Sequence, residues 1–153
     1  MNILAIVGSP RRRGNTSTII ETICEAAGEA GHECDIQHIY DYDLNGCRAC
    51  GKCKSGEVEL CAQDDDMAEL LLRVINSDCL IFGSPVYMGQ VTGPAKTFLD
   101  RFYAFSTKGF GVRYLEGKKL ITVITGGAPA EKYKSVEEYL HRLRYGRRAF
   151  RRY

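Results

Sequence analysis

The chain has 153 residues, a formal net charge of +2 and a hydrophobic fraction of 44%, and 26% of its residues are charged. This length and composition suit one ordinary folded domain and exclude a disordered, collagen-like or low-complexity chain. The apolar runs at 3–7, 79–82 and 120–124 are far too short to cross a bilayer. Because no signal-peptide pattern opens the chain, we expect a cytoplasmic protein without a membrane partner.

Four segments have the pattern of β-strands. A nearly continuous apolar run suits a central parallel strand covered on both faces, whereas alternation of apolar and polar residues suits an edge strand. Continuous runs occur at 2–7, 79–83 and 120–124, and the alternating pattern occurs at 33–40.

Helical periodicity separates these strands. Helices are predicted to begin near Asn15, at the acidic run 64–66 and at Thr92, and a further helix is predicted over 135–145. Asn, Thr and Asp favour helix N-termini because they accept hydrogen bonds from free backbone N–H groups or complement the helix dipole. Strands that alternate with helices predict an α/β fold, a doubly wound parallel sheet in three αβα layers.

In an open α/β sheet, ligands bind at the carboxyl ends of the strands. Three loops that leave strands there, 8–17, 84–91 and 125–129, are rich in Gly, Ser, Thr and Pro. The first loop precedes a helix N-terminus and offers hydroxyl groups and backbone N–H groups, which suits a phosphate monoester. It has neither the Gly-x-Gly-x-x-Gly pattern nor the Lys of a Walker loop. A plain polar turn remains the alternative interpretation.

Four of the seven cysteines form the compact pattern Cys47-x2-Cys50-x2-Cys53-x7-Cys61. It lies in segment 41–63, which has no periodicity and is interpreted as a Cys-rich insertion. Short spacings let one loop wrap an iron–sulfur cluster, but four thiolates can also hold structural zinc, and free or oxidised thiols are a further alternative. Cys24, Cys34 and Cys79 lie in periodic segments and are interpreted as packing residues.

Several motifs in the same order resemble the NADPH-dependent FMN reductase group of flavodoxin-like proteins. They are Gly8-Ser9-Pro10-Arg11, Gly14-Asn15-Thr16-Ser17, Asp65-Asp66-Met67, Gly83-Ser84-Pro85-Val86-Tyr87 and Lys96-Thr97-Phe98-Leu99-Asp100-Arg101. The Cys pattern resembles the iron–sulfur flavoprotein branch of that group. The resemblance implies one flavodoxin-like FMN-binding domain over 1–153 with strand order 2-1-3-4. Because only four strands can be placed, we expect the usual fifth strand to be missing.

The resemblance also implies cofactors and the residues that hold them. FMN would place its phosphate on Ser9, Arg11, Asn15, Thr16 and Ser17. Its ribityl chain and ring would lie along Pro85, Val86, Tyr87, Met88 and Gly89, with Thr125, Gly126 and Gly127 as the third edge. Cys47, Cys50, Cys53 and Cys61 would hold a [4Fe-4S] cluster. Taken alone, Tyr87 is equally well interpreted as a partly buried loop residue, and no catalytic side chain is expected because FMN carries the chemistry.

These expectations describe an FMN-dependent oxidoreductase that passes electrons between a donor, FMN and the cluster. The donor would be a ferredoxin-like protein or NAD(P)H, and the acceptor a quinone, O2 or peroxide. One alternative is a cluster-free NAD(P)H-dependent FMN or quinone reductase, and another is a non-catalytic redox sensor.

The basic C-terminal tail, 141–153, carries six Arg and no acidic residue, so the rest of the chain has 15 Lys+Arg against 19 Asp+Glu. The tail is interpreted as a solvated terminus, with an acidic protein, the phosphates of NADPH or nucleic acid as alternative partners. Of these, we do not expect nucleic acid. The resemblance implies a homodimer or homotetramer.

Overall fold

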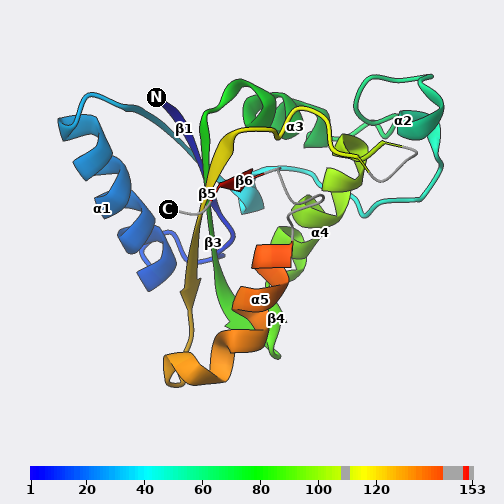
Figure 1. The fold of residues 1–153 in the computed structure, drawn as a ribbon. Coiled ribbons are helices and arrows are strands. Elements are labelled where there is room, and N and C mark those ends of the chain that lie inside the picture. The colour runs from blue at the N-terminus through cyan, green and yellow to red at the C-terminus, as the bar shows by residue number, and fades with distance from the viewer. Residues whose placement is uncertain (108–110, 143–149, 152–153) are drawn as a thin grey trace.

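A parallel sheet with the strand order β2-β1-β3-β5-β6 lies at the centre of the fold (Figure 1). The structure is a computed structural model that describes residues 1–107, 111–142 and 150–151. Its strands are β1 (Asn2–Val7), β2 (Glu33–His38), β3 (Cys79–Tyr87), β4 (Gln90–Val91), β5 (Lys118–Thr125) and β6 (Phe150–Arg151). Apart from β4, which is antiparallel to β3, the order corresponds to the flavodoxin-like 2-1-3-4-5 sheet. The predicted fold class is therefore confirmed.

The expectation of a missing fifth strand is wrong. Phe150 and Arg151 form β6, which pairs in parallel with Lys118 and Lys119 of β5. Two residues within an Arg-rich segment give no apolar run, so the sequence pattern could not reveal this strand. The rest of the predicted basic tail lies outside the described residues, apart from the end of α5.

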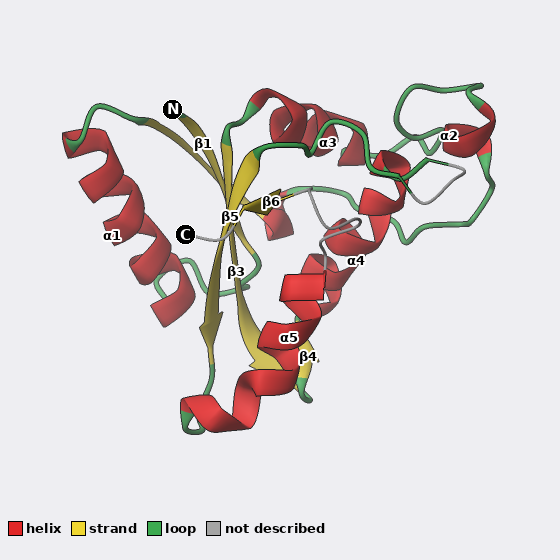
Figure 2. Ribbon diagram, in the orientation of Figure 1, coloured by secondary structure: helices red, strands yellow, loops and turns green. Residues whose placement is uncertain are grey.

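Helices cover both faces of the sheet, as Figure 2 shows. They are α1 (Asn15–Glu29), α2 (Lys52–Ser55), α3 (Met67–Asn76), α4 (Gly93–Arg101) and α5 (Lys134–Arg142), with short 3-10 helices at Ile39–Asp41, Phe102–Phe105 and Ala130–Tyr133. The α1 helix packs on one face through Ile20 and Cys24. The other face, which includes Leu4 and Phe82, is covered by α3, α4 and α5. Burial on both faces explains the continuous apolar runs of the central strands.

The third strand is longer than predicted, because the expected loop 84–91 is mostly a hairpin. β3 continues through Tyr87, and Val86 and Tyr87 pair with Val91 and Gln90 of β4. The two residues between these strands, Met88 and Gly89, have φ values of 49° and 78°. Positive φ at both positions is typical of a tight type I′ hairpin turn. Pro85 has no backbone N–H to donate to a neighbouring strand, but the strand continues past it.

The first and third strands approach each other too closely for a side chain at Gly8. The N–H of Gly8 donates to the carbonyl oxygen of Gly83 at 2.7 Å, and the carbonyl oxygen of Gly8 accepts from the hydroxyl of Thr92 at 2.7 Å. A Cβ at position 8 would lie 2.8 Å from the Gly83 oxygen and 2.9 Å from the Cβ of Ala95. The loop after β1 is thereby fixed to β3 and to the start of α4.

Between β2 and α3 the chain leaves the sheet as a loop that includes α2 and projects beyond α3 and α4 (Figure 1). We call residues 43–66 the Cys-rich loop, and its two ends, 43–46 and 61–66, the neck. Across the neck, the N–H of Asp66 donates to the carbonyl oxygen of Asp43 at 3.1 Å, and the side-chain amide of Gln63 donates to the carbonyl oxygen of Gly46 at 3.1 Å.

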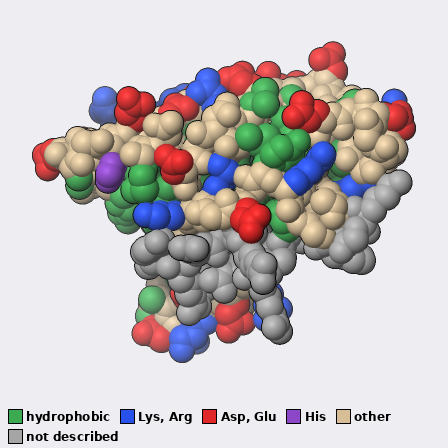
Figure 3. Space-filling view, turned by 45° about the horizontal axis from the view of Figure 1, so that its top comes forward, with side chains coloured by type: hydrophobic (Ala, Val, Ile, Leu, Met, Phe, Trp, Pro, Cys, Tyr) green, Lys and Arg blue, Asp and Glu red, His purple; other side chains and the backbone are tan. Residues whose placement is uncertain are grey.

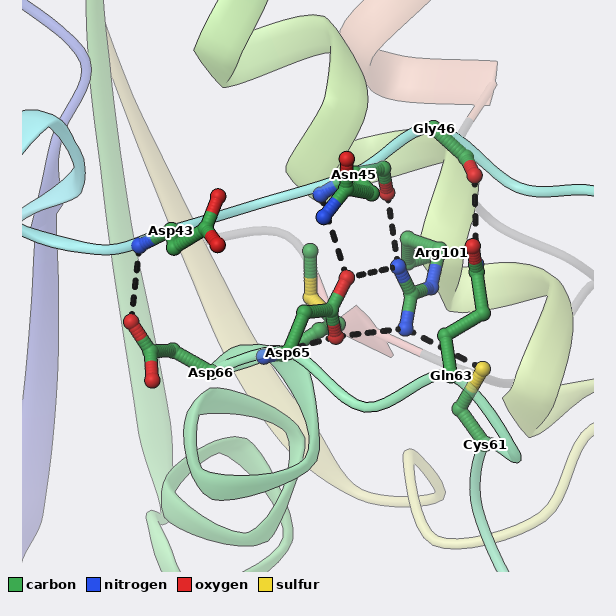
Figure 4. A network of polar contacts seen from close by, with 9 residues as sticks. Asp43, Asn45, Gly46, Cys61, Gln63, Asp65, Asp66 and Arg101 are labelled. Atoms are coloured by element: carbon green, nitrogen blue, oxygen red, sulfur yellow. Dashed lines mark hydrogen bonds and ion pairs between the residues drawn. The ribbon is translucent and has the colours of Figure 1, made fainter.

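A buried ion pair completes this neck (Figure 4). The guanidinium of Arg101, at the end of α4, lies 2.6 Å from Oδ2 and 2.9 Å from Oδ1 of Asp65, and the two side chains are 1% and 0% exposed. The same guanidinium donates to the carbonyl oxygen of Asn45 at 2.6 Å. Asp65 was expected only to help open a helix. It does accept from the N–H of Met67 at 3.2 Å, but its larger role is to fix the loop to α4.

The close approach at Gly8 makes a testable prediction about stability. Gly8→Ala should lower the free energy of unfolding by about 1–3 kcal/mol, because the new methyl group meets backbone and Cβ atoms that cannot easily move. Gly28→Ala is the matched control: nothing lies within 4 Å of a Cβ there, and alanine in a helix should stabilise by about 0.5–1 kcal/mol. Urea denaturation of both variants measures the difference, and equal midpoints would contradict the close approach.

A second prediction concerns the pH dependence of the Asp65–Arg101 pair. Burial alone would raise the pKa of Asp65, but hydrogen bonds from Arg101 and two backbone N–H groups, together with the charge of Arg101, lower it overall. Since the folded pKa lies below the unfolded value of about 3.9, the carboxylate stabilises the fold fully above about pH 4 and loses this contribution as the pH falls through the folded value.

Asp65→Asn should therefore destabilise the protein by about 3–5 kcal/mol near neutral pH, because it leaves Arg101 charged and buried. The difference from the unsubstituted protein should shrink below about pH 4. Asp35→Asn, which removes an exposed partner of Arg73, should cost less than about 1 kcal/mol. Denaturation at a series of pH values measures both, and a difference that stays constant into strong acid would contradict the assignment.

Candidate functional site

The loop after β1 is held in a fixed shape by its own hydrogen bonds. The carbonyl oxygen of Arg11 accepts from the N–H of Gly14 at 3.2 Å and from the hydroxyl of Ser17 at 3.0 Å. The N–H of Arg11 donates to the hydroxyl oxygen of Ser9 at 3.1 Å. Ser9 and Ser17 are buried, whereas Arg11 is exposed. The loop therefore places hydroxyl groups inside its curve and leaves a cationic side chain outside.

The N-terminus of α1 opens into this loop without a side-chain cap. Its N-cap residue is Gly14, which has no side chain to cap it, and the first turn contains no acidic residue. The first helical bond runs from the N–H of Thr18 to the carbonyl oxygen of Gly14 at 3.0 Å. Because the preceding N–H groups have no partner within the helix, they are available to an anion, which the helix dipole also favours.

Two of the predicted loops meet directly. The hydroxyl oxygens of Thr16 and Thr125 lie 2.7 Å apart, which joins the start of α1 to the end of β5. Thr16 is almost completely buried. The first and third predicted edges of the cofactor site are therefore neighbours at the carboxyl ends of the strands.

The predicted second edge lies on the β3–β4 hairpin. Pro85 and Val86 are half-buried, and Tyr87, Met88 and Gly89 are exposed. Tyr87 is 47% exposed and Met88 is completely exposed at the tip of the turn. The hairpin thus presents an aromatic and a thioether side chain to solvent, beyond the end of the sheet.

A cavity of about 580 Å³ lies at the end of β5. Three of the predicted site residues line it, Asn15, Thr125 and Gly126. Sequence reasoning gave no site role to its other lining residues, which include Tyr133 and Glu137. Tyr133 lies against Gly126, where a Cβ would be 2.2 Å from the tyrosine oxygen. The same oxygen accepts a hydrogen bond from the N–H of Ala128 at 2.8 Å. In the sequence, the Gly126-Gly127 pair could have indicated that another residue packs closely there. No pattern indicated that this residue is Tyr133. Gly127 is exposed.

The four clustered cysteines differ in their surroundings. Cys47 and Cys50 are exposed, and Cys53 and Cys61 are half-buried. Burial raises the pKa of the Cys53 thiol, Lys54 partly opposes this, and Cys61 and Cys47 raise it further. Cys47 and Cys61 therefore each lie within electrostatic reach of Cys53. In the described part of the chain, no three His, Cys, Asp or Glu side chains form a group that could hold a metal ion.

The Cys-rich loop is fastened to the segment after α4. The ammonium of Lys54 donates to the carbonyl oxygen of Tyr103 and to the carbonyl and hydroxyl oxygens of Ser106. Burial lowers the pKa of Lys54. Arg113 donates to the carbonyl oxygen of Glu59 at 2.6 Å and to that of Cys53 at 3.3 Å. Two cations therefore hold the middle of the loop, from Cys53 to Glu59, in place.

Near the neck, the sulfur of Cys61 accepts a hydrogen bond from Nη2 of Arg101 at 3.1 Å (Figure 4). A hollow of about 460 Å³ beside the neck is lined by Asn45, Arg48, Cys50, Lys52, Ala62, Gln63 and Asp64. The donor set, four thiols among cationic side chains, has the chemistry of an iron–sulfur or zinc ligand set. In the described conformation, however, the loop does not bring the four sulfurs together.

The other three cysteines lie on the opposite side of the sheet. Burial raises the pKa of Cys24 to about 12, and a hydrogen bond with Cys34 adds to the effect. Burial also raises the pKa of Cys79. The buried thiols of Cys24 and Cys79 suit the predicted packing role.

The surface of the described residues is mixed in charge. On the face that Figure 3 presents, acidic and basic side chains are interspersed and do not form one large patch of a single sign. Within the described part of the chain, none of the helices has the length and apolar character needed to span a membrane.

Comparisons with known proteins agree with this geometry. The family model described as NADPH-dependent FMN reductase matches residues 1–150. An iron–sulfur flavoprotein of Methanosarcina thermophila is 32% identical over 142 residues, which cover 92% of this chain and 73% of that protein. An iron–sulfur flavoprotein of Archaeoglobus fulgidus is 40% identical over 101 residues, which cover 66% of this chain and 48% of that protein. The chain thus spans only about half the length of this second relative.

Solved structures support the same fold. An NADH:FMN oxidoreductase in its apo form is 26% identical with a TM-score of 0.63, covering 93% of this chain and 66% of that one. An NAD(P)H:quinone oxidoreductase from Methanothermobacter marburgensis has a TM-score of 0.75 at 18% identity, covering 97% of this chain and 79% of that one. On the evidence of the family model and the relatives, the chain belongs to the NADPH-dependent FMN reductase family, in its iron–sulfur flavoprotein branch.

Proposed function

We propose that the protein is an FMN-dependent oxidoreductase. The observation that carries this proposal is the uncapped N-terminus of α1, which faces a loop with buried hydroxyl groups at the carboxyl end of the sheet. Such a site suits a dianionic phosphate monoester better than a neutral ligand, because the backbone N–H groups and the helix dipole both favour negative charge. Family membership supports FMN as that ligand.

In this proposal the chain binds and orients the flavin, and the flavin supplies hydride and single-electron chemistry when it is bound. Ser9, Thr16 and Ser17 lie at the phosphate end, with Arg11 and Asn15 at its exposed side. The hairpin residues Pro85, Val86, Tyr87, Met88 and Gly89 and the segment Thr125, Gly126 and Gly127 would border the rest of the flavin. Tyr133 joins this third edge because it covers Gly126.

The electron donor is proposed to be NAD(P)H or a ferredoxin-like protein, with a quinone, O2 or peroxide as acceptor. The family description supports a nicotinamide donor. The names of the relatives support a route that includes an iron–sulfur centre.

We further propose that Cys47, Cys50, Cys53 and Cys61 hold a [4Fe-4S] cluster. Four thiolates in one compact loop are the usual ligand set of such a cluster. Two of them, Cys53 and Cys61, already lie in the part of the loop that Lys54, Arg113 and Arg101 fix in place. Cationic side chains around the loop would offset the negative charge of a thiolate-bound cluster.

We also propose that the protein forms a homodimer or homotetramer and that it is cytoplasmic. In one chain the Cys-rich loop and the β3–β4 hairpin lie toward opposite ends of the molecule (Figure 1). Assembly is one way in which two such sites could approach each other. All seven cysteines are unpaired, and unpaired thiols persist in a reducing compartment.

A cluster-free flavin reductase is the second candidate. It is favoured by the arrangement of the Cys-rich loop, in which the described thiols do not converge. The third candidate is a non-catalytic redox sensor, in which the basic tail would be the contact to a partner. Most of that tail lies outside the described residues.

The phosphate site makes a specific prediction. Ser9→Asp should weaken FMN binding at least about tenfold, because like charges about 4 Å apart in a partly buried site repel by several kcal/mol. Ser9→Asn is the matched control, since it has nearly the same size without the charge, and it should retain more flavin than the aspartate variant. Fluorescence titration of the apoproteins with FMN measures both affinities. Equal affinities for the two variants would place the phosphate elsewhere.

The cluster makes a separate prediction. Protein purified without oxygen should contain about four iron and four sulfide per FMN. Cys61→Ser should lower the iron content and leave the flavin content unchanged, whereas Cys79→Ser should change neither. Iron, sulfide, zinc and flavin analyses measure this directly. Stoichiometric FMN without iron, even after reconstitution, would favour the cluster-free reductase.

A further inference from the structure

The segment that follows β5 has few anchors of its own. Residues 126–132 are all exposed, and the segment joins the end of β5 to α5 beyond the end of the sheet (Figure 1). Gly126, Ala128 and Ala130 line the cavity of about 580 Å³, so no packed core supports the segment on that side. Its shape therefore depends on the contacts at its two ends.

At the first end, Thr125 connects the segment to the loop after β1. Its hydroxyl oxygen lies 2.7 Å from that of Thr16, which is almost completely buried at the start of α1. Thr16 belongs to the proposed phosphate site. This contact therefore fixes where the third edge begins relative to the phosphate.

At the second end, Tyr133 holds the segment by its ring and by its oxygen. The hydroxyl oxygen accepts from the N–H of Ala128 at 2.8 Å. The ring lies so close to Gly126 that a Cβ there would be 2.2 Å from the hydroxyl oxygen and 2.3 Å from Cζ. Tyr133 directly precedes α5, whose residues Val136 and Leu140 are 1% and 0% exposed in the core. Tyr133 thus connects the exposed segment to a helix that is anchored in the core.

The contact with Tyr133 also divides the backbone donors of the segment. It occupies the N–H of Ala128, whereas among the described residues the N–H groups of Gly126 and Gly127 have no acceptor. Both glycines are exposed, and neither has a side chain that would keep a ligand away from the backbone. Backbone N–H groups commonly orient ligands, and the carbonyl oxygens and ring nitrogens of a flavin are acceptors for them.

We propose that Tyr133 is a positioning residue for FMN. Its hydroxyl oxygen and ring fix residues 125–128, so that the N–H groups of Gly126 and Gly127 are the hydrogen-bond donors of the third edge. The inference rests on the proposed function, since it concerns FMN at this edge. A segment that is ordered before binding loses less conformational freedom when the ligand arrives, and the affinity is higher for that reason. Phenylalanine could supply the ring but not the acceptor.

The test measures the affinity of the full-length apoprotein for FMN and for riboflavin, which lacks the phosphate, by fluorescence titration. Tyr133→Phe keeps the ring and removes the acceptor for the N–H of Ala128. The loss of one hydrogen bond should weaken the binding of both ligands by the same factor, about threefold to tenfold. Tyr139→Phe is the matched control, because it removes a hydroxyl from α5 at a tyrosine whose ring centroid lies 5.9 Å from the ammonium of Lys96. It should leave both affinities unchanged.

Unchanged affinities in Tyr133→Phe would overturn the inference. An equal loss in Tyr139→Phe would overturn it too, since a general effect on α5 would then explain the result. A loss for FMN without a loss for riboflavin would also count against it, because Tyr133 would then act on the phosphate site. Ser9→Asp should show that opposite pattern, with weaker binding of FMN and unchanged binding of riboflavin.

Failure of the proposed function has a different outcome, because the unsubstituted protein would then bind neither FMN nor riboflavin. Amide hydrogen exchange of the unsubstituted protein separates the two cases, and it also decides if Tyr133→Phe does not fold. Relative to intrinsic rates, the N–H of Ala128 should exchange more slowly than those of Gly126 and Gly127. With FMN bound, exchange at the two glycines should slow as well. Equal exchange at all three positions in the free protein, or no change at the glycines when FMN binds, would overturn the inference.

Discussion

The buried contact between Arg101 and Asp65 is the constraint on which the Cys-rich loop depends. A charged pair taken out of water is stable only when further hydrogen bonds satisfy its remaining donors and acceptors. Here Asn45, Met67 and Cys61 supply further bonds from both ends of the loop, and Nε of Arg101 is left buried without a partner. Consequently, the loop cannot separate from α4 without leaving a charge unpaired, although it contains few apolar anchors of its own.

The α4 helix connects this neck to the proposed flavin site. At its start, the hydroxyl of Thr92 bonds to the carbonyl oxygen of Gly8, and at its end Arg101 bonds to the neck. Nine residues of helix span about 14 Å. Phe98 packs between Phe82 and Phe102, with ring centroids 6.2 and 4.9 Å away. A rigid, well-packed helix therefore fixes the position of both sites relative to the sheet.

Helix starts and central strands could be predicted from the local sequence, whereas contacts between residues far apart in the chain could not. The starts of α1 and α4 followed from Asn15 and Thr92, and the central strands from their continuous apolar runs. Asp65 could be interpreted only as a helix-opening acid, because its partner lies 36 positions away. Tyr133 was missed for the same reason, since a close approach to Gly126 depends on how the chain turns after β5. The hairpin at Met88 was hidden because proline and glycine usually mark loops.

The Cys-rich loop is divided into a fixed part and an open part, and this division bears on the proposed cluster. Cys53 and Cys61 belong to the part that Arg113 and Arg101 hold, whereas Cys47 and Cys50 are exposed in the part before it. Between and beside the exposed pair, Ala49 and Gly51 have φ values of 51° and 76°. Alanine in this left-handed region costs about 1–2 kcal/mol, so a change of conformation at 47–51 would release strain. The exposed pair of cysteines therefore lies in the segment with the strained backbone, whereas Cys61 lies on the neck that Arg101 holds.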